Sequence, residues 1–214
     1  MSATPPAPGR DCALCPRLAA FRTEQRQRYA DWHNAPVPSF GGLEARLLVV
    51  GLAPGLKGAN RTGRPFTGDY AGDLLYATLE KHGFAAGSYE ARADDGFALM
   101  DCRITNAVRC VPPQNKPEPK EVACCRGFLA AEIAAMTNLR QILALGAIAH
   151  GAVLMTLGEK RAQHPFAHGA RHELTGGLIL TDSYHCSRYN TNTRRLTPAM
   201  FEAVVAGVRA AIDD

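Results

Sequence analysis

The stretch Arg46-Leu-Leu-Val-Val-Gly51, followed at once by Leu52-Ala-Pro-Gly55, decides the fold class of this 214-residue chain. A short apolar run that ends in glycine and proline is typical of a strand buried on both faces. Similar runs occupy residues 103–108, 141–146 and 178–181, and segments with helical spacing separate them. This alternation predicts a parallel sheet with helices on both faces.

The helices are predicted from apolar spacing and from the residues that begin and end them. Residues 70–82 place Leu74, Leu75 and Leu79 on one side, and Gly83 follows as a C-cap. Residues 119–136 begin with proline, as helices often do, and 147–157 end at Gly158. A last helix is expected from about residue 197 to 212. We expect residues 1–10 to be a disordered tail and 11–214 to form a single domain.

The composition excludes several classes of protein. The chain is 46% hydrophobic and 21% charged, which is typical of a globular domain. No run of 18 apolar residues occurs, so no membrane-spanning helix is expected. The first ten residues lack the charged start and apolar stretch of a signal peptide, which predicts a cytoplasmic or nucleoid-associated protein. The net charge of +4 permits a polyanionic partner without requiring one.

The polar and unusual residues follow the predicted strands. Residues 51–69 carry five glycines and two prolines, so the backbone can approach a ligand closely, although a tight turn without a ligand is an alternative. The Gly-Lys-Ser/Thr sequence of a phosphate loop is absent. Ligands of parallel sheets bind at the carboxyl ends of the strands. The segments after Gly51, Val108 and Thr181 should therefore meet at one cleft.

The seven cysteines favour a metal centre over disulfide bonds, because their number is odd and no signal peptide precedes them. Cys12, Cys15, Cys110 and Cys125 provide four thiolates, which suit zinc or an iron–sulfur cluster. Cys124 competes with Cys125 as the fourth ligand. Buried thiols without a metal are the alternative interpretation.

His185 stands just past the fourth predicted strand, where a functional side chain is expected, although a structural role is the more common one for a lone histidine. Three further histidines, at 164, 168 and 172, lie near Arg161 and Arg171. No carboxylate completes a helical metal-binding spacing there, which favours an exposed, partly positive loop.

Three motifs give the chain a resemblance to a known family. The loop 51–69, the segment Val108-Arg-Cys-Val-Pro-Pro-Gln-Asn-Lys-Pro117 and His185-x-Ser187-x2-Asn190 resemble family 5 uracil-DNA glycosylases over residues 12 to about 197. The sister family 4 has glutamate where this chain has Leu52. Cys186 departs from the proline that commonly follows this histidine.

The resemblance implies a three-layer α/β/α fold with a central four-stranded parallel sheet. It also implies excision of uracil, and of other deaminated bases such as hypoxanthine in some members, from DNA. The four cysteines at 12, 15, 110 and 125 would hold a [4Fe-4S] cluster. The expected partner is damaged DNA, and a monomer without membrane contact is expected.

The reaction assigns roles to particular residues. His185 would donate to the uracil carbonyl, and Asp69 would activate water or stabilise the sugar cation while also capping a helix. Phe66 would form the wall against the extruded base, unless it only anchors the loop. Backbone groups at Gly51, Ala53 and Gly55 and the amides of Asn115 and Asn190 would contact base or sugar. The residues expected to contact DNA are Arg61, Arg64, Arg188, Tyr189 and Arg194.

Two other functions use parts of the same sequence. A non-enzymatic iron–sulfur or zinc protein that binds DNA would need the cysteines but neither His185 nor Asp69. A hydrolase of free nucleosides or nucleotides would use the same cleft without the arginines of the 188–195 segment.

Overall fold

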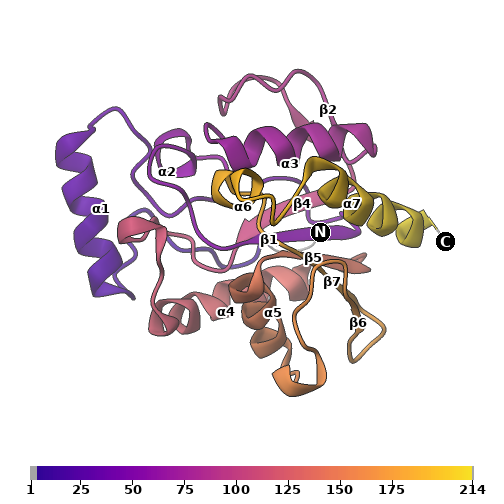
Figure 1. Ribbon diagram of the computed structural model, residues 1–214. Coiled ribbons are helices and arrows are strands. Elements are labelled where there is room, and N and C mark those ends of the chain that lie inside the picture. The colour runs from indigo at the N-terminus through magenta and orange to yellow at the C-terminus, as the bar shows by residue number, and fades with distance from the viewer. Residues whose placement is uncertain (1–3, 214) are drawn as a thin grey trace.

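A computed structural model describes residues 4–213, and its ribbon is shown in Figure 1. Its central sheet contains β1 (Leu47–Gly51), β4 (Cys102–Asn106), β5 (Gln141–Leu145), β6 (Arg171–Glu173) and β7 (Ile179–Ser183). The strand order is β4-β1-β5-β7-β6. The first four strands pair in parallel, and β6 pairs antiparallel with β7.

The predicted fold class is confirmed, but the sheet has five strands and not four. The additional strand β6 is the edge strand of three residues, Arg-His-Glu, and only His172 among them is buried. A strand of this length and polarity produces no apolar run, so the pattern that revealed the four parallel strands does not apply to it.

The larger helices cover the two faces of the sheet. Helices α3 (Tyr70–Lys81) and α7 (Pro198–Asp213) pack on one face, and α4 (Pro119–Ala135) and α5 (Ala147–Leu157) pack on the other. Strand β1 supplies both cores, because alternate side chains of a strand point to opposite faces. Leu47 and Val49 lie in the core with α3 and α7, whereas Leu48 and Val50 lie in the core with α4 and α5.

Smaller elements complete the structure. Helix α1 (Pro16–Arg28) precedes the sheet, and its spacing lacks a continuous apolar stripe, since Leu18, Arg22 and Gln25 are its buried residues. The other short elements are α2 (Ala59–Thr62), the hairpin strands β2 (Ala85–Ala86) and β3 (Ala98–Leu99), the 3-10 turns η1 (Pro113–Asn115) and η2 (Arg161–Gln163), and α6 (Arg188–Asn192).

Of the expected N-terminal tail, residues 1–3 lie outside the described residues, and residues 4–9 form neither helix nor strand. Within residues 4–213, none of the helices combines the length and apolar character that crossing a membrane requires.

Candidate active site

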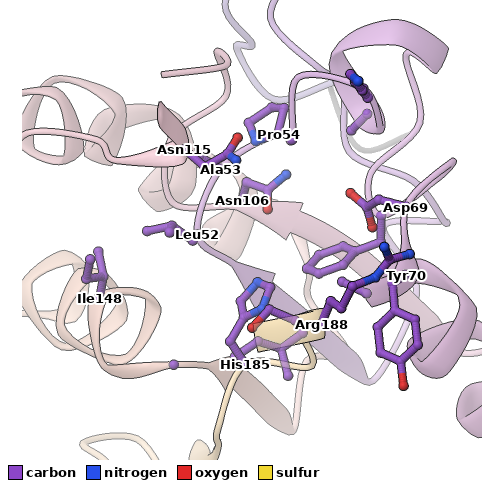
Figure 2. Close-up of a pocket in the computed structure, with 18 of the residues that line it drawn as sticks. Leu52, Ala53, Pro54, Asp69, Tyr70, Asn106, Asn115, Ile148, His185 and Arg188 are labelled. Carbon is purple, nitrogen blue, oxygen red and sulfur yellow. The ribbon is translucent and has the colours of Figure 1, made fainter. Parts of the chain in front are cut away.

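A cavity of about 700 Å³ opens at the carboxyl ends of the parallel strands (Figure 2). The three segments expected to meet do so here: the loop after β1, the segment after β4 and the loop after β7 all contribute residues. The start of α5 adds Gly146, Ala147 and Ile148. The polar and charged side chains of the lining are those of Lys57, Asp69, Tyr70, Asn106, Asn115, His185, Ser187 and Arg188.

Asp69 lines the cavity and caps α3 at the same time. Its Oδ1 accepts a hydrogen bond from the Gly72 N–H at 3.2 Å. Its Oδ2 lies so close to Gly58 that a Cβ atom there would be 2.3 Å away, and at Gly55 it would be 3.0 Å away. The glycines thus leave room beside the carboxylate. Burial raises the pKa of Asp69, although backbone hydrogen bonds from Gly72 and Ala71 oppose the shift.

His185 follows β7 and points into the same cavity (Figure 2). Within the described chain, its Nδ1 is buried and has no hydrogen-bond partner. Burial lowers the pKa of His185 to about 4, because the charged imidazolium is penalised away from water. At neutral pH the imidazole is therefore neutral. One uncommitted ring nitrogen is available to a bound group.

Phe66 supplies an aromatic wall to the cavity. Its ring centroid lies 5.8 Å from that of His185, with 29° between the ring planes. The residue is 7% exposed and has a φ of +51°, which is unusual for a side chain of this size. Gly51 lies beneath it, since a Cβ there would be 2.6 Å from the Phe66 ring and 2.4 Å from Asn106 Oδ1. Glycine at the end of β1 is thus required by this packing.

Asn106 was not predicted as a site residue from the sequence. It is the last residue of β4, it lines the cavity and it is 4% exposed. In the part of the chain that is described, its Oδ1 is buried without a hydrogen-bond partner. No clear signal for it exists in the sequence, because Asn106 lies inside the strand predicted at 103–108, whereas β4 ends at Asn106, next to Gly51 of β1 in the register of the sheet.

The two predicted asparagines take different places. Asn115 lines the cavity from η1, with an exposed side chain and a φ of +55°. Asn190 is absent from the cavity lining, and its Nδ2 instead donates to the backbone carbonyl of His185 at 2.8 Å. The side chain of Ser187 caps α6 by accepting from the Asn190 N–H. Asn190 is therefore placed to hold the His185 loop rather than to contact a base.

The predicted DNA-contacting residues divide into exposed and buried ones. Arg61, Arg188, Tyr189 and Arg194 are exposed, Tyr189 by 73%. Arg188 borders the cavity with its guanidinium 5.5 Å from the Tyr70 ring centroid. Arg64 is different, because its side chain is 5% exposed and paired with Asp95 at 2.7 Å. The expectation that Arg64 contacts DNA is therefore wrong.

The predicted metal ligands come from α1's N-terminal side, the segment after β4, and α4. Burial raises the pKa of Cys15 to about 12, and repulsion from the thiols of Cys125, Cys124 and Cys110 adds to the shift. Repulsion from the Cys12 thiol likewise contributes to the raised pKa values of Cys110 and Cys125. These interactions place the four predicted ligands in one cluster of thiols. Cys125 is buried and Cys124 is exposed.

The histidines of the 164–172 segment do not all lie in an exposed loop. His172 is 9% exposed, and its Nε2 lies 3.0 Å from Asp182 Oδ2. His150 Nδ1 lies 2.8 Å from the other oxygen of Asp182. This buried network connects α5, β6 and β7 near the β6 edge of the sheet, and its residues do not line the cavity.

Comparison with known proteins identifies a family. Residues 38–209 match the model of the Uracil DNA glycosylase superfamily. A type-5 uracil-DNA glycosylase from Thermus thermophilus is 45% identical over 199 residues, which cover 91% of this chain and 90% of that protein. Another, from Pyrobaculum aerophilum, is 41% identical over 95% of this chain and 89% of its own length.

Similarity to type-4 enzymes is more limited. A type-4 uracil-DNA glycosylase from Thermotoga maritima is 40% identical over 110 residues, which cover 51% of this chain and 49% of that protein. The type-5 relatives match nearly the whole chain, and the type-4 relatives only about half of it or slightly more. This chain belongs to the uracil DNA glycosylase superfamily and, within it, to the type-5 uracil-DNA glycosylases.

Proposed function

We propose that this chain excises uracil from DNA by hydrolysing the N-glycosidic bond, leaving an abasic site. The observation that carries the proposal is the meeting of Asp69, Asn106 and His185 in one cavity, in a chain whose type-5 uracil-DNA glycosylase relatives align over nearly all of it. A base stacked in a duplex is out of reach, so the nucleotide must be extruded into the cavity. The ring of Phe66 offers the surface on which the extruded base stacks.

The recognition of uracil is assigned to Asn106. A side-chain amide offers one acceptor and two donors, which match the N–H and the neighbouring carbonyl on one edge of uracil. The buried, unpaired Oδ1 of Asn106 supports this role, because burying an unpaired polar group has a cost that a bound ligand would remove.

Bond cleavage leaves negative charge on the departing base and positive character on the sugar. The neutral imidazole of His185 is placed to donate a hydrogen bond to the developing anion, with backbone N–H groups of the 51–55 turn beside it. The Asp69 carboxylate is placed to accept a proton from the attacking water or to stabilise the sugar cation. Gly55 and Gly58 leave space for the reacting groups next to Oδ2.

The clustered cysteines fit a four-iron cluster better than a single zinc ion. A tetrahedral zinc site brings its sulfur atoms to about 3.8 Å from one another. In the described chain no three of the cysteine sulfur atoms lie mutually within 4.8 Å. A [4Fe-4S] cluster spreads its four thiolates over four iron atoms, so its ligands stand farther apart. When bound by Cys12, Cys15, Cys110 and Cys125, the group would supply a structural cross-link and no step of the hydrolysis.

Arg22 supports the same assignment. It is 4% exposed, its Nη1 lies 3.4 Å from Cys110 Sγ, and its Nη2 donates to the Cys12 carbonyl. Its Nε is buried without a partner in the described chain. A buried guanidinium requires negative charge nearby, and a cluster held by four thiolates would provide it.

The proposal extends to deaminated bases other than uracil. A cavity of about 700 Å³ exceeds what one pyrimidine fills, and its lining includes small residues such as Ala53, Gly55 and Gly146. This supports activity on the larger base hypoxanthine, which presents an N–H and a carbonyl similar to those of uracil.

A gel assay on a uracil-containing oligonucleotide, with alkali to cleave abasic sites, tests the function. We expect cleavage at uracil and none at thymine, and no cleavage by an Asp69→Asn, His185→Ala variant. Arg92→Gln changes an exposed residue that does not line the cavity, and it serves as the matched control. Binding without abasic sites would favour a DNA-binding protein. Release of uracil from the free nucleoside alone would favour a nucleoside hydrolase.

A further inference from the structure

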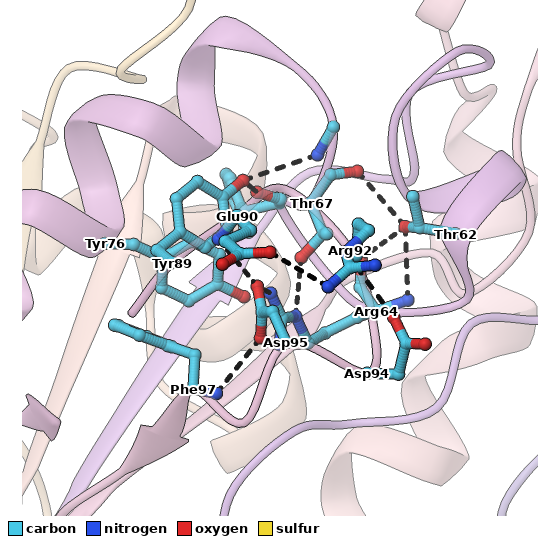
Figure 3. A network of polar contacts seen from close by, with 12 residues as sticks. Thr62, Arg64, Thr67, Tyr76, Tyr89, Glu90, Arg92, Asp94, Asp95 and Phe97 are labelled. Atoms are coloured by element: carbon cyan, nitrogen blue, oxygen red, sulfur yellow. Dashed lines mark hydrogen bonds and ion pairs between the residues drawn. The ribbon is translucent and has the colours of Figure 1, made fainter. Parts of the chain in front are cut away.

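The side chain of Arg64, a residue of the glycine-rich loop, is enclosed in a cage of aromatic rings and the Asp95 carboxylate (Figure 3). Its two terminal nitrogens donate to the two oxygens of Asp95 at 2.7 and 2.8 Å, and its Nε donates to Thr67 Oγ1 at 2.8 Å. The side chain of Asp95 is fully buried. The Arg64 guanidinium holds the pKa of Asp95 well below its usual range, so the pair is ionised at neutral pH.

Four aromatic rings surround the guanidinium. The Arg64 Cζ lies between 5.1 and 5.9 Å from the ring centroids of Phe40, Tyr76, Tyr89 and Phe97. Such contacts are attractive between a cation and an aromatic face, and they matter most away from water. Burying an ion pair has a large desolvation cost, which good geometry and additional hydrogen bonds must offset. Both conditions are met here, because the ion pair is bidentate and the Arg64 Nε has its own hydrogen-bond acceptor.

The cage holds the backbone of residues 65–68 in place. The hydroxyl of Tyr76 donates to the Pro65 carbonyl at 2.6 Å, and that of Tyr89 donates to the Phe66 carbonyl at 3.3 Å. The Gly68 N–H donates to the Tyr89 hydroxyl at 3.4 Å. The Thr62 hydroxyl donates to the Thr67 carbonyl at 3.1 Å. Each backbone carbonyl from residue 65 to 67 therefore has a hydrogen-bond partner.

Phe66 lies at the centre of this segment and has a φ of +51°. A bulky residue in this region of conformational space is strained by about 1–3 kcal/mol and stays there only when its surroundings enforce it. This conformation also points the ring into the cavity, 5.8 Å from the His185 ring. Relaxation of the segment would move the aromatic wall away from the imidazole.

We propose that Arg64 and Asp95 are positioning residues for the glycosylase reaction, which hold Phe66 in the strained conformation that forms the base-binding wall. The proposal rests on the proposed function of the cavity. Asp95 also accepts hydrogen bonds from the Glu90 and Phe97 N–H groups at 3.0 Å. The pair thereby connects the segment between β2 and β3 to the active site. Neither residue contacts the cavity itself.

A double-mutant cycle tests whether the pair acts through Phe66. Asp95→Asn should slow single-turnover excision of uracil by about tenfold in the parent, because relaxing strain of this size changes a rate by that order. In a Phe66→Leu background the same change should slow the reaction by less than about twofold, since the two residues are coupled. Tyr89→Phe, which removes one hydroxyl and little packing, should follow the same pattern if Asp95→Asn folds poorly.

Two controls separate positioning from general destabilisation. Val208→Ala removes buried side-chain atoms from α7, outside the cavity lining, and should lower the melting temperature without slowing excision. Arg92→Gln removes an exposed ion pair from the segment between β2 and β3, which also carries Asp95, and it should change neither the melting temperature nor the excision rate. Equal slowing by Asp95→Asn in the parent and the Phe66→Leu background would overturn the proposal.

Amide hydrogen exchange gives a readout that needs no activity. Asp95→Asn and Tyr89→Phe should speed exchange at the amides of residues 66–69, where the Gly68 N–H donates to the Tyr89 hydroxyl, and Val208→Ala should leave those amides unchanged. If exchange is faster in these two variants but the parent protein releases no uracil, the proposed function is refuted and the positioning role of Arg64 and Asp95 is kept. Unchanged exchange in both variants would refute the positioning pair whatever the activity.

Discussion

Burial shifts the pKa values of the two reactive side chains in opposite directions. It raises the pKa of the Asp69 carboxyl and lowers that of the His185 imidazole to about 4. Each shift favours the neutral form, as desolvation requires. The imidazole is consequently neutral throughout the physiological range, whereas Asp69, in its proposed role as a base, would accept a proton only above its raised pKa.

A pH profile distinguishes the two residues. The excision rate of the parent should fall as the pH drops through the raised pKa of Asp69, because the protonated carboxyl accepts no proton. His185→Ala should lower the rate by about 100- to 1000-fold at every pH and keep this acid limb. Asp69→Asn should remove the limb and slow the reaction by about 100- to 10,000-fold. An acid limb that survives in Asp69→Asn would contradict the assignment.

Asp69→Asn should also stabilise the protein. The pKa of Asp69 is higher in the folded than in the unfolded protein. The free energy of unfolding therefore falls as the pH rises from the unfolded to the folded pKa, and it remains at this lower value at higher pH. Asparagine keeps the N-cap of α3 without a buried charge. A melting temperature at pH 7.5 equal to or above that of the parent is expected, and a clear decrease would count against a buried, ionised Asp69.

Asn106→Ala should impair recognition more than folding. Loss of the amide leaves the polar edge of uracil unpaired, which costs about 1–3 kcal/mol, or roughly five- to 150-fold in excision rate. The melting temperature should change little or rise, because the unpaired Oδ1 is removed with the side chain. Single-turnover assays and calorimetry on the same preparation measure both effects, and a parent-like rate would exclude Asn106 from recognition.

At the scale of single elements, α6 follows the His185 loop and presents Arg188 and Tyr189 to solvent. An extruded base leaves a gap in the stack, and a tyrosine ring can stack on the exposed neighbours. A variant with Arg188→Ala and Tyr189→Ala should slow excision from duplex DNA more than from single strands, which have less stacking to lose. Equal slowing on both substrates would leave these residues as general DNA contacts.

Helix α3 approaches the loop so closely at Gly72 that a Cβ atom there would lie 1.6 Å from the Phe66 carbonyl oxygen. Gly72→Ala should therefore displace either the helix or the Phe66 segment. A fall in excision rate with loss of thermal stability is expected. Gly127→Ala in α4, where a Cβ atom meets nothing within 4 Å, is the matched control and should be neutral or stabilising. A parent-like Gly72→Ala would show that the loop is not tightly held.

The strands and large helices could be predicted to within a few residues, because each carries an apolar period and an end signal. Strand β1 was expected at 46–51 and lies at Leu47–Gly51, and α5 was expected and found at 147–157. Strand β6 and helix α1 could not be predicted, since their stability comes from tertiary contacts such as the Asp182 network and the contacts of Arg22. The spacing of apolar residues within a segment does not reveal such contacts.

The site residues likewise divide into those that a local motif predicts and those whose place depends on tertiary contacts. Asp69, Phe66 and His185 were predicted because they stand in motifs after strand ends, and the cavity brings them together. Arg64 stands in the same motif, but its burial depends on Asp95 and on rings from distant segments. Asn106 lies inside the strand predicted at 103–108, so the local sequence does not distinguish it from an ordinary strand residue. Only the register of β4 against β1 places it beside Gly51 and over the cavity.

At the scale of the whole molecule, Cys12, Cys15, Cys110 and Cys125 come from distant parts of the chain, which a bound [4Fe-4S] cluster would join. Cys12→Ser should yield protein without iron, and Arg22→Gln should bind iron but lose its visible absorbance faster in air, because the cluster charge is no longer compensated. Iron content and absorbance after anaerobic purification measure both. Stoichiometric zinc in the parent, or unchanged air sensitivity in Arg22→Gln, would contradict this account.

The thiols of Cys15 and Cys110 are separated by 94 residues of chain, and this span includes β1, α3 and β4. In the language of polymer physics, a cluster on the four cysteines would close that span into a ring. Closing a loop of about 100 residues removes disorder from the unfolded chain worth about 4.7 kcal/mol in the chain-entropy account. The iron supply of a cell would then influence what fraction of the copies is folded, even though no step of the proposed hydrolysis runs through the cluster.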